Sequence, residues 1–147
     1  ELPASGEGAD ASFDLPREGM PAILVLAPTR ELACQIEIEV ERFRKPVGIA
    51  VLAVYGGTPK APQLAGLRGQ PHVVVATPGR LNDVLQELPG ASTTGSLMRD
   101  VRFLVLDEAD RMLDDGFEPQ VRRIVRDVSA QQRQTMMFSA TWPETVR

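Results

Sequence analysis

The sequence predicts a doubly wound parallel α/β sheet, and two observations support this fold class. Short, almost continuously apolar runs recur along the chain from residue 22 onward, and segments with helical apolar spacing lie between them. Strands that are covered on both faces of a sheet have this uninterrupted apolar character, and strands that alternate with helices form parallel sheets. The expected strands are 22–27, 49–54, 73–76, 103–106 and 135–138.

The longest expected helix spans 29–45, with Thr29 as its N-cap and with Pro46 and Gly48 ending it. Its apolar stripe consists of Leu32, Ile36, Val40 and Phe43. A second helix is expected over 119–128, where Pro119 suits the first turn. Its apolar positions are Val121, Ile124, Val125 and Val128. Shorter helices are expected over 63–68 and 80–88, and 89–96 is expected to be a surface loop.

Composition limits the classes of function. The 147 residues are 43% hydrophobic, which suits one globular domain, and no run approaches the roughly 18 apolar residues of a membrane helix. The net charge of −4 argues against nucleic-acid binding by bulk positive charge, although a few arginines and backbone N–H groups could still bind it. Residues 1–21 have no hydrophobic periodicity and are interpreted as a flexible linker or loop.

Two single residues receive structural interpretations. Cys34 is the only cysteine, so no internal disulfide can form, and the side chain is expected to pack as a small apolar group in a protein of a reducing, intracellular compartment. His72 is the only histidine and has no second ligand nearby, which argues against a histidine metal site.

Polar residues follow every expected strand at its carboxyl end. The five segments are Pro28-Thr29-Arg30-Glu31, Tyr55-Gly56-Gly57-Thr58, Thr77-Pro78-Gly79-Arg80, Asp107-Glu108-Ala109-Asp110 and Ser139-Ala140-Thr141. Ligands of open parallel sheets bind outside the carboxyl ends of the strands, so we expect the five segments to form one polar rim.

The acidic segment has the arrangement called Walker B, in which two adjacent carboxylates follow an apolar strand. Asp107 would hold Mg²⁺, largely through water, and Glu108 would act as general base toward an attacking water. An isolated pair of this kind is more often a solvated helix start that the helix dipole favours. The four other polar strand ends favour the functional interpretation here.

In this order and spacing, the five segments resemble motifs Ia, GG, Ib, II and III of the DEAD-box ATP-dependent RNA helicase family. The resemblance covers residues 22–147 and looks nearest to the nuclear subgroup that includes the Dbp2-type helicases. It implies a partial RecA-like (P-loop NTPase) domain, the first of two, with ATP and Mg²⁺ as cofactors. It also implies an intracellular location, with the nucleus favoured over the cytoplasm, and no membrane association.

The resemblance assigns roles to the residues of these motifs. Asp107 would position Mg²⁺, Glu108 would activate water at the γ-phosphate, and Asp110 would bond the hydroxyls of Ser139 and Thr141, which would link the ATP and RNA sites. Simple N-capping of a helix at Pro143 remains open for Ser139 and Thr141.

The candidates for RNA binding are polar or glycine residues that can donate to phosphate. They are Thr29, Arg30, Gly57, Thr77, Gly79 and Arg80. Guanidinium forks and close backbone N–H groups suit phosphate, and none of these residues is an aromatic stacking platform. We therefore expect sequence-independent contacts to the backbone of single-stranded or short duplex RNA. A surface salt bridge is the alternative for Arg80.

The sequence departs from the family in one respect that bears on activity. No Gly-Lys pair occurs, because Lys45 follows Arg44 and Lys60 follows Pro59, so the P-loop lysine, with its strand and helix, is expected to be missing. The second RecA-like domain, a partner expected from the parent chain, is expected to be missing as well. We therefore expect no appreciable ATPase or unwinding activity from this chain alone, and an exposed sheet edge that favours marginal stability or association.

Two other functions fit parts of the same sequence pattern. A non-catalytic RNA- or partner-binding module of the same fold is the alternative to a helicase fragment. Another Walker B ATPase, such as a DNA helicase or motor, fits less well because of Ala109 and the complete Thr77–Arg80 segment.

Overall fold

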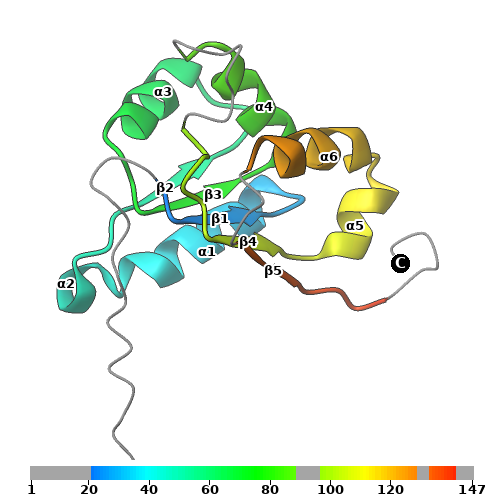
Figure 1. Cartoon of the computed structure of the whole chain (residues 1–147), viewed down its shortest axis with the longest axis horizontal. Helices are drawn as coiled ribbons and strands as arrows, with labels where there is room; N and C mark the ends of the chain where they lie inside the picture. The colour runs from blue at the N-terminus through cyan, green and yellow to red at the C-terminus, as the bar shows by residue number, and fades with distance from the viewer. Residues whose placement is uncertain (1–20, 89–96, 129–132, 142–147) are drawn as a thin grey trace, which may run out of the picture.

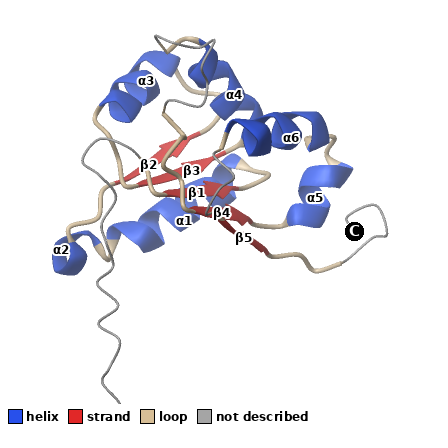
Figure 2. Ribbon diagram, viewed as in Figure 1, coloured by secondary structure: helices blue, strands red, loops and turns tan. Residues whose placement is uncertain are grey.

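A five-stranded parallel sheet organises the part of the chain that the structure describes. The computed structural model describes residues 21–88, 97–128 and 133–141. The strands are β1 (Ile23–Leu26), β2 (Val51–Val54), β3 (Val73–Ala76), β4 (Phe103–Leu106) and β5 (Gln134–Met137). Their order in the sheet is β2-β3-β1-β4-β5, and every pairing is parallel (Figures 1 and 2). The predicted fold class and all five strands are confirmed. The strand β1 is one residue shorter than expected at each end, β2 begins two residues later than expected, and β5 lies one residue earlier.

Helices cover both faces of the sheet. The helices are α1 (Arg30–Glu41), α2 (Arg44–Val47), α3 (Lys60–Arg68), α4 (Pro78–Gln86), α5 (Ala109–Asp114) and α6 (Glu118–Asp127). Figure 1 shows α3, α4 and α6 on one side of the sheet and α1 on the other side. The architecture is therefore the three-layer, doubly wound arrangement that the alternation of strands and helices predicts.

Alternate residues of the strands supply two apolar layers. Leu24, Leu26, Val74 and Leu104 belong to the larger core cluster beneath α3, α4 and α6, whereas Val25, Val73 and Val75 belong to the smaller cluster that Ala33 of α1 completes. Successive side chains of a strand point to opposite faces, so an uninterrupted apolar run supplies both layers at once.

The helix expected over 29–45 is wrong near its C-terminal end, where the structure has a break and a second short helix. Thr29 caps α1 as predicted, with its Oγ1 accepting from the Leu32 N–H at 3.2 Å. The helix ends at Glu41, and Pro46 lies inside the separate short helix α2 rather than ending the first one. Phe43 falls outside α1 and its side chain is 57% exposed, so it does not belong to the apolar stripe.

The other helices agree closely with the sequence. The helix expected over 119–128 is α6, which ends one residue earlier, at Asp127. Ile124 of α6 and its C-cap residue Val128 are buried in the larger core cluster, and Val121 and Val125 pack against it. The helices α3 and α4 begin three and two residues before their expected starts at 63 and 80. The expected loop 89–96 and most of the expected linker 1–21 lie outside the described residues.

The two edges of the sheet differ. At the β2 edge, the N–H of Ala53 donates to Oε1 of Glu37 at 2.7 Å, so a side chain from α1 satisfies a backbone donor that no strand pairs. At the other edge, β5 pairs with β4 and, within the described residues, with no other strand. None of the helices in the described ranges is long and apolar enough to cross a membrane.

Candidate functional site

All five polar segments lie at one edge of the sheet, as the sequence predicts. Because the strands are parallel, Leu26, Val54, Ala76, Leu106 and Met137 lie side by side at their carboxyl ends. The segments that follow β1, β2 and β3 gather around a groove, and those that follow β4 and β5 contact one another.

The groove beyond β1, β2 and β3 has a volume of about 380 Å³. Its lining residues come from four separate segments of the chain: Pro28, Arg30, Gly56, Thr77, Gly79, Arg80, Asp83 and Phe117. Four RNA-binding candidates, Arg30, Thr77, Gly79 and Arg80, therefore share one cavity. Thr29 and Gly57 do not line it, although each precedes or follows a residue that does.

Two helix N-termini open onto this groove. Thr29 caps α1 with its side chain, whereas Thr77 precedes α4 in an extended conformation with no side-chain cap bond. The N–H groups of a helix start carry a partial positive charge, which favours a bound anion. Glycine at position 79 leaves open space where a Cβ would stand, so a ligand can approach the backbone there.

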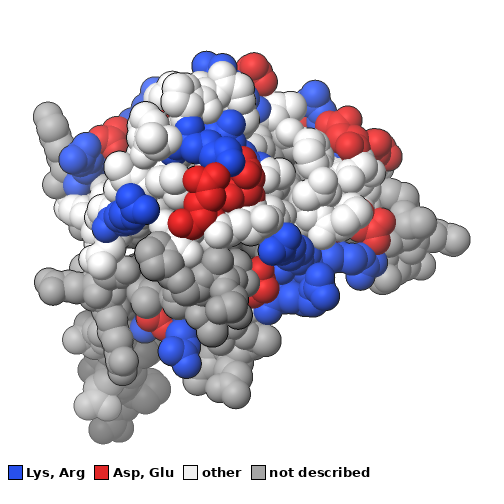
Figure 3. Space-filling model, turned by 90° about the horizontal axis from the view of Figure 1, so that it is seen from above, with Lys and Arg blue, Asp and Glu red and all other residues white. Residues whose placement is uncertain are grey.

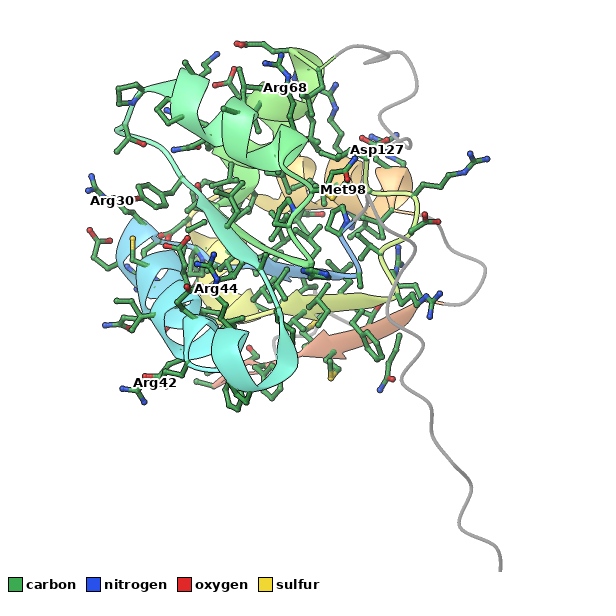
Figure 4. The ribbon with its side chains drawn as sticks, turned by 90° about the vertical axis from the view of Figure 1, so that its left-hand side faces the viewer. Arg30, Arg42, Arg44, Arg68, Met98 and Asp127 are labelled. Atoms are coloured by element: carbon green, nitrogen blue, oxygen red, sulfur yellow. The ribbon has the colours of Figure 1, made fainter. Side chains whose placement is uncertain are left out.

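Arg30 is exposed and its guanidinium lies over an aromatic ring. Its Cζ is 5.1 Å from the centroid of the Tyr55 ring, and Figure 4 shows the side chain at the outer edge of the molecule, at the start of α1. Its Nη1 stands 3.8 Å from the position that a Cβ on Gly57 would occupy. The geometry therefore keeps the N–H edge of Arg30 available to a ligand.

Arg80 differs, because other residues of the chain already bind it. Its Nη1 donates to the Thr58 carbonyl at 2.9 Å and to Gln63 Oε1 at 3.4 Å, and its Nε lies 3.7 Å from Asp83 Oδ2. The Arg80 side chain is only 12% exposed. The salt bridge that was the alternative for Arg80 is thus present, although Arg80 also lines the groove.

Gln63 connects Arg80 to the loop after β2. This side chain is 7% exposed, and its Nε2 donates to the Tyr55 carbonyl at 2.9 Å and to Thr58 Oγ1 at 2.7 Å. Buried amides are stable only when they are hydrogen-bonded, so Gln63 fixes the loop to α3. The Gly56-Gly57 turn, in which Gly57 has a φ of 79°, is held between these bonds.

Charges around the groove are balanced rather than uniformly basic. Lys60 Nζ donates to Asp83 at 2.7 Å and to Glu87 at 2.5 Å, and the two carboxylates raise the pKa of Lys60 above its ordinary value. Basic and acidic side chains interleave over the face seen in Figure 3. Any phosphate ligand would therefore be bound by individual hydrogen-bond donors rather than by a uniformly basic surface. The net negative charge of the chain leads to the same expectation.

The acidic segment beyond β4 begins with a sharp turn. Asp107 Oδ1 accepts from the Glu108 N–H at 3.0 Å. Glu108 has a left-handed backbone, with φ 49° and ψ 52°, a conformation that is strained for residues other than glycine. Backbone strain of this kind is typical of functional turns. The Glu108 carboxylate accepts a hydrogen bond from Arg111 Nη1 at 3.4 Å.

These carboxylates fit Mg²⁺ by their chemistry. Mg²⁺ prefers hard oxygen ligands and retains several waters, so one or two carboxylates beside a polyphosphate suffice to bind it. Within the described residues there is no cluster of three or more His, Cys, Asp or Glu side chains that would enclose an ion. The donors therefore suit a hydrated ion shared with a ligand, and do not suit a closed protein cage.

Asp110 joins the segments beyond β4 and β5. Its Oδ2 accepts from the Thr141 hydroxyl at 2.8 Å and from the Thr141 N–H at 3.0 Å, as the sequence predicted for Thr141. The Thr141 hydroxyl is the main cause that lowers the pKa of Asp110 from its ordinary value of 3.8. The Ser139 hydroxyl bonds the backbone, since it accepts from the Asp110 N–H at 3.3 Å and donates to the Thr141 carbonyl at 2.5 Å.

Several residues of the site were not predicted. The groove is also lined by Asp83 and Phe117. Gln63 bonds the loop after β2, and the Tyr55 ring lies beneath the Arg30 guanidinium. A polar residue on the buried side of a short helix was the available signal for Gln63, but its partners lie on other elements and are visible only in the fold. The single histidine accepts from the Ala50 N–H at 3.0 Å, which agrees with its structural interpretation.

Comparison with known proteins identifies the family. A family model described as DEAD/DEAH box helicase matches residues 9–147. The chain belongs to this family. The match begins inside the segment that the sequence pattern assigned to a linker.

Curated relatives agree with membership of the DEAD/DEAH box helicases. The "ATP-dependent RNA helicase-like protein DB10" of Nicotiana sylvestris is 56% identical over 127 residues, which are 86% of this chain and 20% of that protein. The "DEAD-box ATP-dependent RNA helicase 46" of Arabidopsis thaliana is 54% identical over 86% of this chain and 19% of its own length. The "ATP-dependent RNA helicase DBP2" of Lodderomyces elongisporus is 47% identical over 99% of this chain and 27% of its own length. The chain thus spans about a fifth to a quarter of the length of these three relatives.

Proposed function

We propose that this chain supplies the RNA-binding groove and the metal and water carboxylates of an ATP-dependent RNA helicase. The observation that carries the proposal is the convergence of Arg30, Thr77, Gly79 and Arg80 on one groove beside two helix N-termini. Guanidinium and backbone N–H donors recognise phosphate oxygens and carry no base preference. The groove would therefore hold the sugar-phosphate backbone of single-stranded or short duplex RNA.

The carboxylates beyond β4 would serve ATP hydrolysis in the parent enzyme. Asp107 would hold Mg²⁺ through water, and Glu108 would orient the attacking water and accept its proton. Bound Mg²⁺ would neutralise charge that develops on the phosphates. Asp110, through Thr141, would connect this carboxylate turn to the segment beyond β5.

Binding of RNA without sequence preference tests the first part. Fluorescence anisotropy of the chain with labelled ten-nucleotide RNAs of oligo(A), oligo(U) and mixed sequence should give dissociation constants within about threefold of one another, because backbone contacts dominate. A preference above about tenfold for one sequence would contradict the proposal.

We also propose that the 147-residue chain does not hydrolyse ATP by itself. It has no Gly-Lys pair to serve as the P-loop lysine, and the donors that stabilise transferred phosphate are mainly that loop and an arginine finger. Phosphate release with saturating RNA should equal the buffer rate. Turnover that Glu108→Gln abolishes would contradict this.

The names of the relatives favour a helicase over a non-catalytic binding module of the same fold. A nuclear location remains part of the proposal, by likeness to the Dbp2-type proteins. A fluorescent fusion of the parent protein that is confined to the cytoplasm would contradict it.

A further inference from the structure

The ring of Tyr55 supports the guanidinium of Arg30. The two groups are 5.1 Å apart, from Cζ to ring centroid, which lies within the range of a cation–π contact. A guanidinium that stacks by its face keeps its N–H groups in the plane and free to form a fork with an oxyanion. Stacking and phosphate binding are therefore compatible for Arg30.

Neighbouring residues hold both the backbone and the side chain of Tyr55. The Tyr55 carbonyl accepts from Gln63 Nε2 at 2.9 Å and from the Thr58 hydroxyl at 3.4 Å, which fixes the backbone beneath the ring. The side chain packs against the smaller core cluster on the α1 face of the sheet. The Cys34 side chain of α1 raises the pKa of Tyr55. The bonded backbone and the packed side chain of Tyr55 therefore give the exposed Arg30 a fixed surface to lie against.

Arg30 has few other constraints. It makes no ion pair or hydrogen bond with the residues that the structure describes, and it is exposed at the first turn of α1. A free arginine loses rotamer entropy when it is fixed. A contact that narrows its conformations before binding reduces that loss.

We propose that Tyr55 is a positioning residue that holds Arg30 ready to bind an RNA phosphate, an inference that rests on the proposed function of the groove. Gly57 fits the same arrangement, since its left-handed φ of 79° turns the loop so that the backbone passes beside Arg30 Nη1. Tyr55 then acts on RNA through Arg30 and needs no contact with RNA of its own.

A double-mutant cycle on RNA affinity tests the proposal. The variants are Tyr55→Leu, Tyr55→Phe, Arg30→Ala and Arg30→Ala with Tyr55→Leu, each titrated into labelled mixed-sequence RNA at low salt. Tyr55→Leu should weaken binding about two- to fivefold, the range of an exposed cation–π contact, and Tyr55→Phe should bind within about twofold of the unmodified chain. The double variant should bind as Arg30→Ala does, because Tyr55 acts only through Arg30.

The controls separate this inference from the proposed function. Val51→Ala trims the same apolar cluster at the far end of β2 and should leave RNA affinity unchanged. If Arg30→Ala binds RNA as well as the unmodified chain, the proposed function fails and the inference fails with it. Two outcomes would overturn only the inference, provided that Arg30→Ala weakens RNA binding. In one, Tyr55→Leu leaves RNA affinity unchanged. In the other, Tyr55→Leu weakens RNA binding equally in the unmodified chain and in the Arg30→Ala chain.

A measurement on the unmodified chain covers the case in which Tyr55→Leu does not fold. The aromatic ring should shift the δ-proton resonances of Arg30 upfield in the NMR spectrum, and Tyr55→Phe should keep that shift. Resonances of Arg30 at the positions of an unstacked arginine would overturn the inference.

Discussion

The carboxyl ends of β1, β2 and β3 are held by bonds from several elements, whereas those of β4 and β5 are held mainly by bonds within and between two short turns. In the first region, buried Gln63 of α3 bonds the loop after β2 and contacts Arg80 of α4. In the second region, Asp107 bonds the next residue, and Asp110 bonds Thr141 at the surface.

This difference indicates two ways to build a ligand site. The groove beyond β1, β2 and β3 has its backbone and one of its arginines, Arg80, bonded within the protein, which would reduce the ordering cost of binding a ligand there. The turn at Asp107 and Glu108 presents oxygen donors in a strained conformation, and under the proposed function a ligand would complete it. Substitutions at the groove should therefore change stability more than those at the carboxylate turn.

The largest effect is expected for Gln63→Ala. It leaves the Arg80 guanidinium and the loop after β2 with fewer bonds inside the protein, so the free energy of unfolding should fall by about 1–3 kcal/mol. Urea denaturation followed by circular dichroism measures this change, and RNA affinity should fall with it.

The matched control is Asn82→Ala, the other buried polar side chain of the described residues. Asn82 Nδ2 donates to the Pro78 and Gln120 carbonyls at 3.1 Å, which joins α4 to α6 away from the loop after β2. It should cost similar stability and leave RNA affinity nearly unchanged. A Gln63→Ala chain as stable as the unmodified one would break the comparison between the two regions.

A smaller effect is expected at the carboxylate turn for Thr141→Val. Losing the hydroxyl bond should raise the pKa of Asp110 toward 3.8, its ordinary value, as measured by NMR titration of the carboxyl carbon. Because the pKa of Asp110 is lowered in the folded state, its contribution to stability is present above pH 3.8 and disappears as the pH falls through the folded pKa.

The stability of the Thr141→Val chain should therefore differ little from that of the unmodified chain at neutral pH, and the difference should vanish in acid. Thr141→Ser, which keeps the hydroxyl, is the control. An Asp110 pKa that does not respond to Thr141→Val would show that the Thr141 hydroxyl does not bond Asp110 in solution.

The smallest effect concerns the pKa of Tyr55 alone. The Cys34 side chain is the largest cause that raises this pKa, so Cys34→Ala should lower it toward 10.0, its ordinary value. Tyr55 is the only tyrosine, so the ultraviolet absorbance of its phenolate reports the titration without interference from another tyrosine. A Tyr55 pKa that is unchanged in Cys34→Ala would show that the Cys34 side chain does not interact with the Tyr55 hydroxyl.

The sequence predicts the strands well because each is a short apolar run that the buried sheet requires, whatever its neighbours are. The end of α1 was wrong because Phe43 has the spacing of the stripe but lies beyond the last residue of the helix. Proline at 46 was expected to end a helix, but its fixed φ is also tolerated in the first turn of the new helix α2.

The candidate site could be predicted where a motif lies at the end of a strand. Asp110 and Thr141 are such a case, since neighbouring strands bring their ends together. The roles of Gln63, Asp83 and Phe117 depend on how α3, α4 and α6 pack, and a linear pattern holds no such information. Arg30 and Arg80 look equivalent in the sequence, and only the fold shows that one is exposed and the other is bound within the protein.

RNA affinity of Arg30→Ala, measured against salt concentration, tests the central claim most directly. The control is Arg42→Ala, which removes another exposed arginine, one that pairs with Glu39 at the other end of α1. If Arg30 contacts one phosphate, Arg30→Ala should weaken binding roughly threefold to tenfold and reduce the slope of log affinity against log salt by about 0.7, while Arg42→Ala should change neither. Equal effects of the two substitutions, or none from Arg30→Ala, would contradict the account.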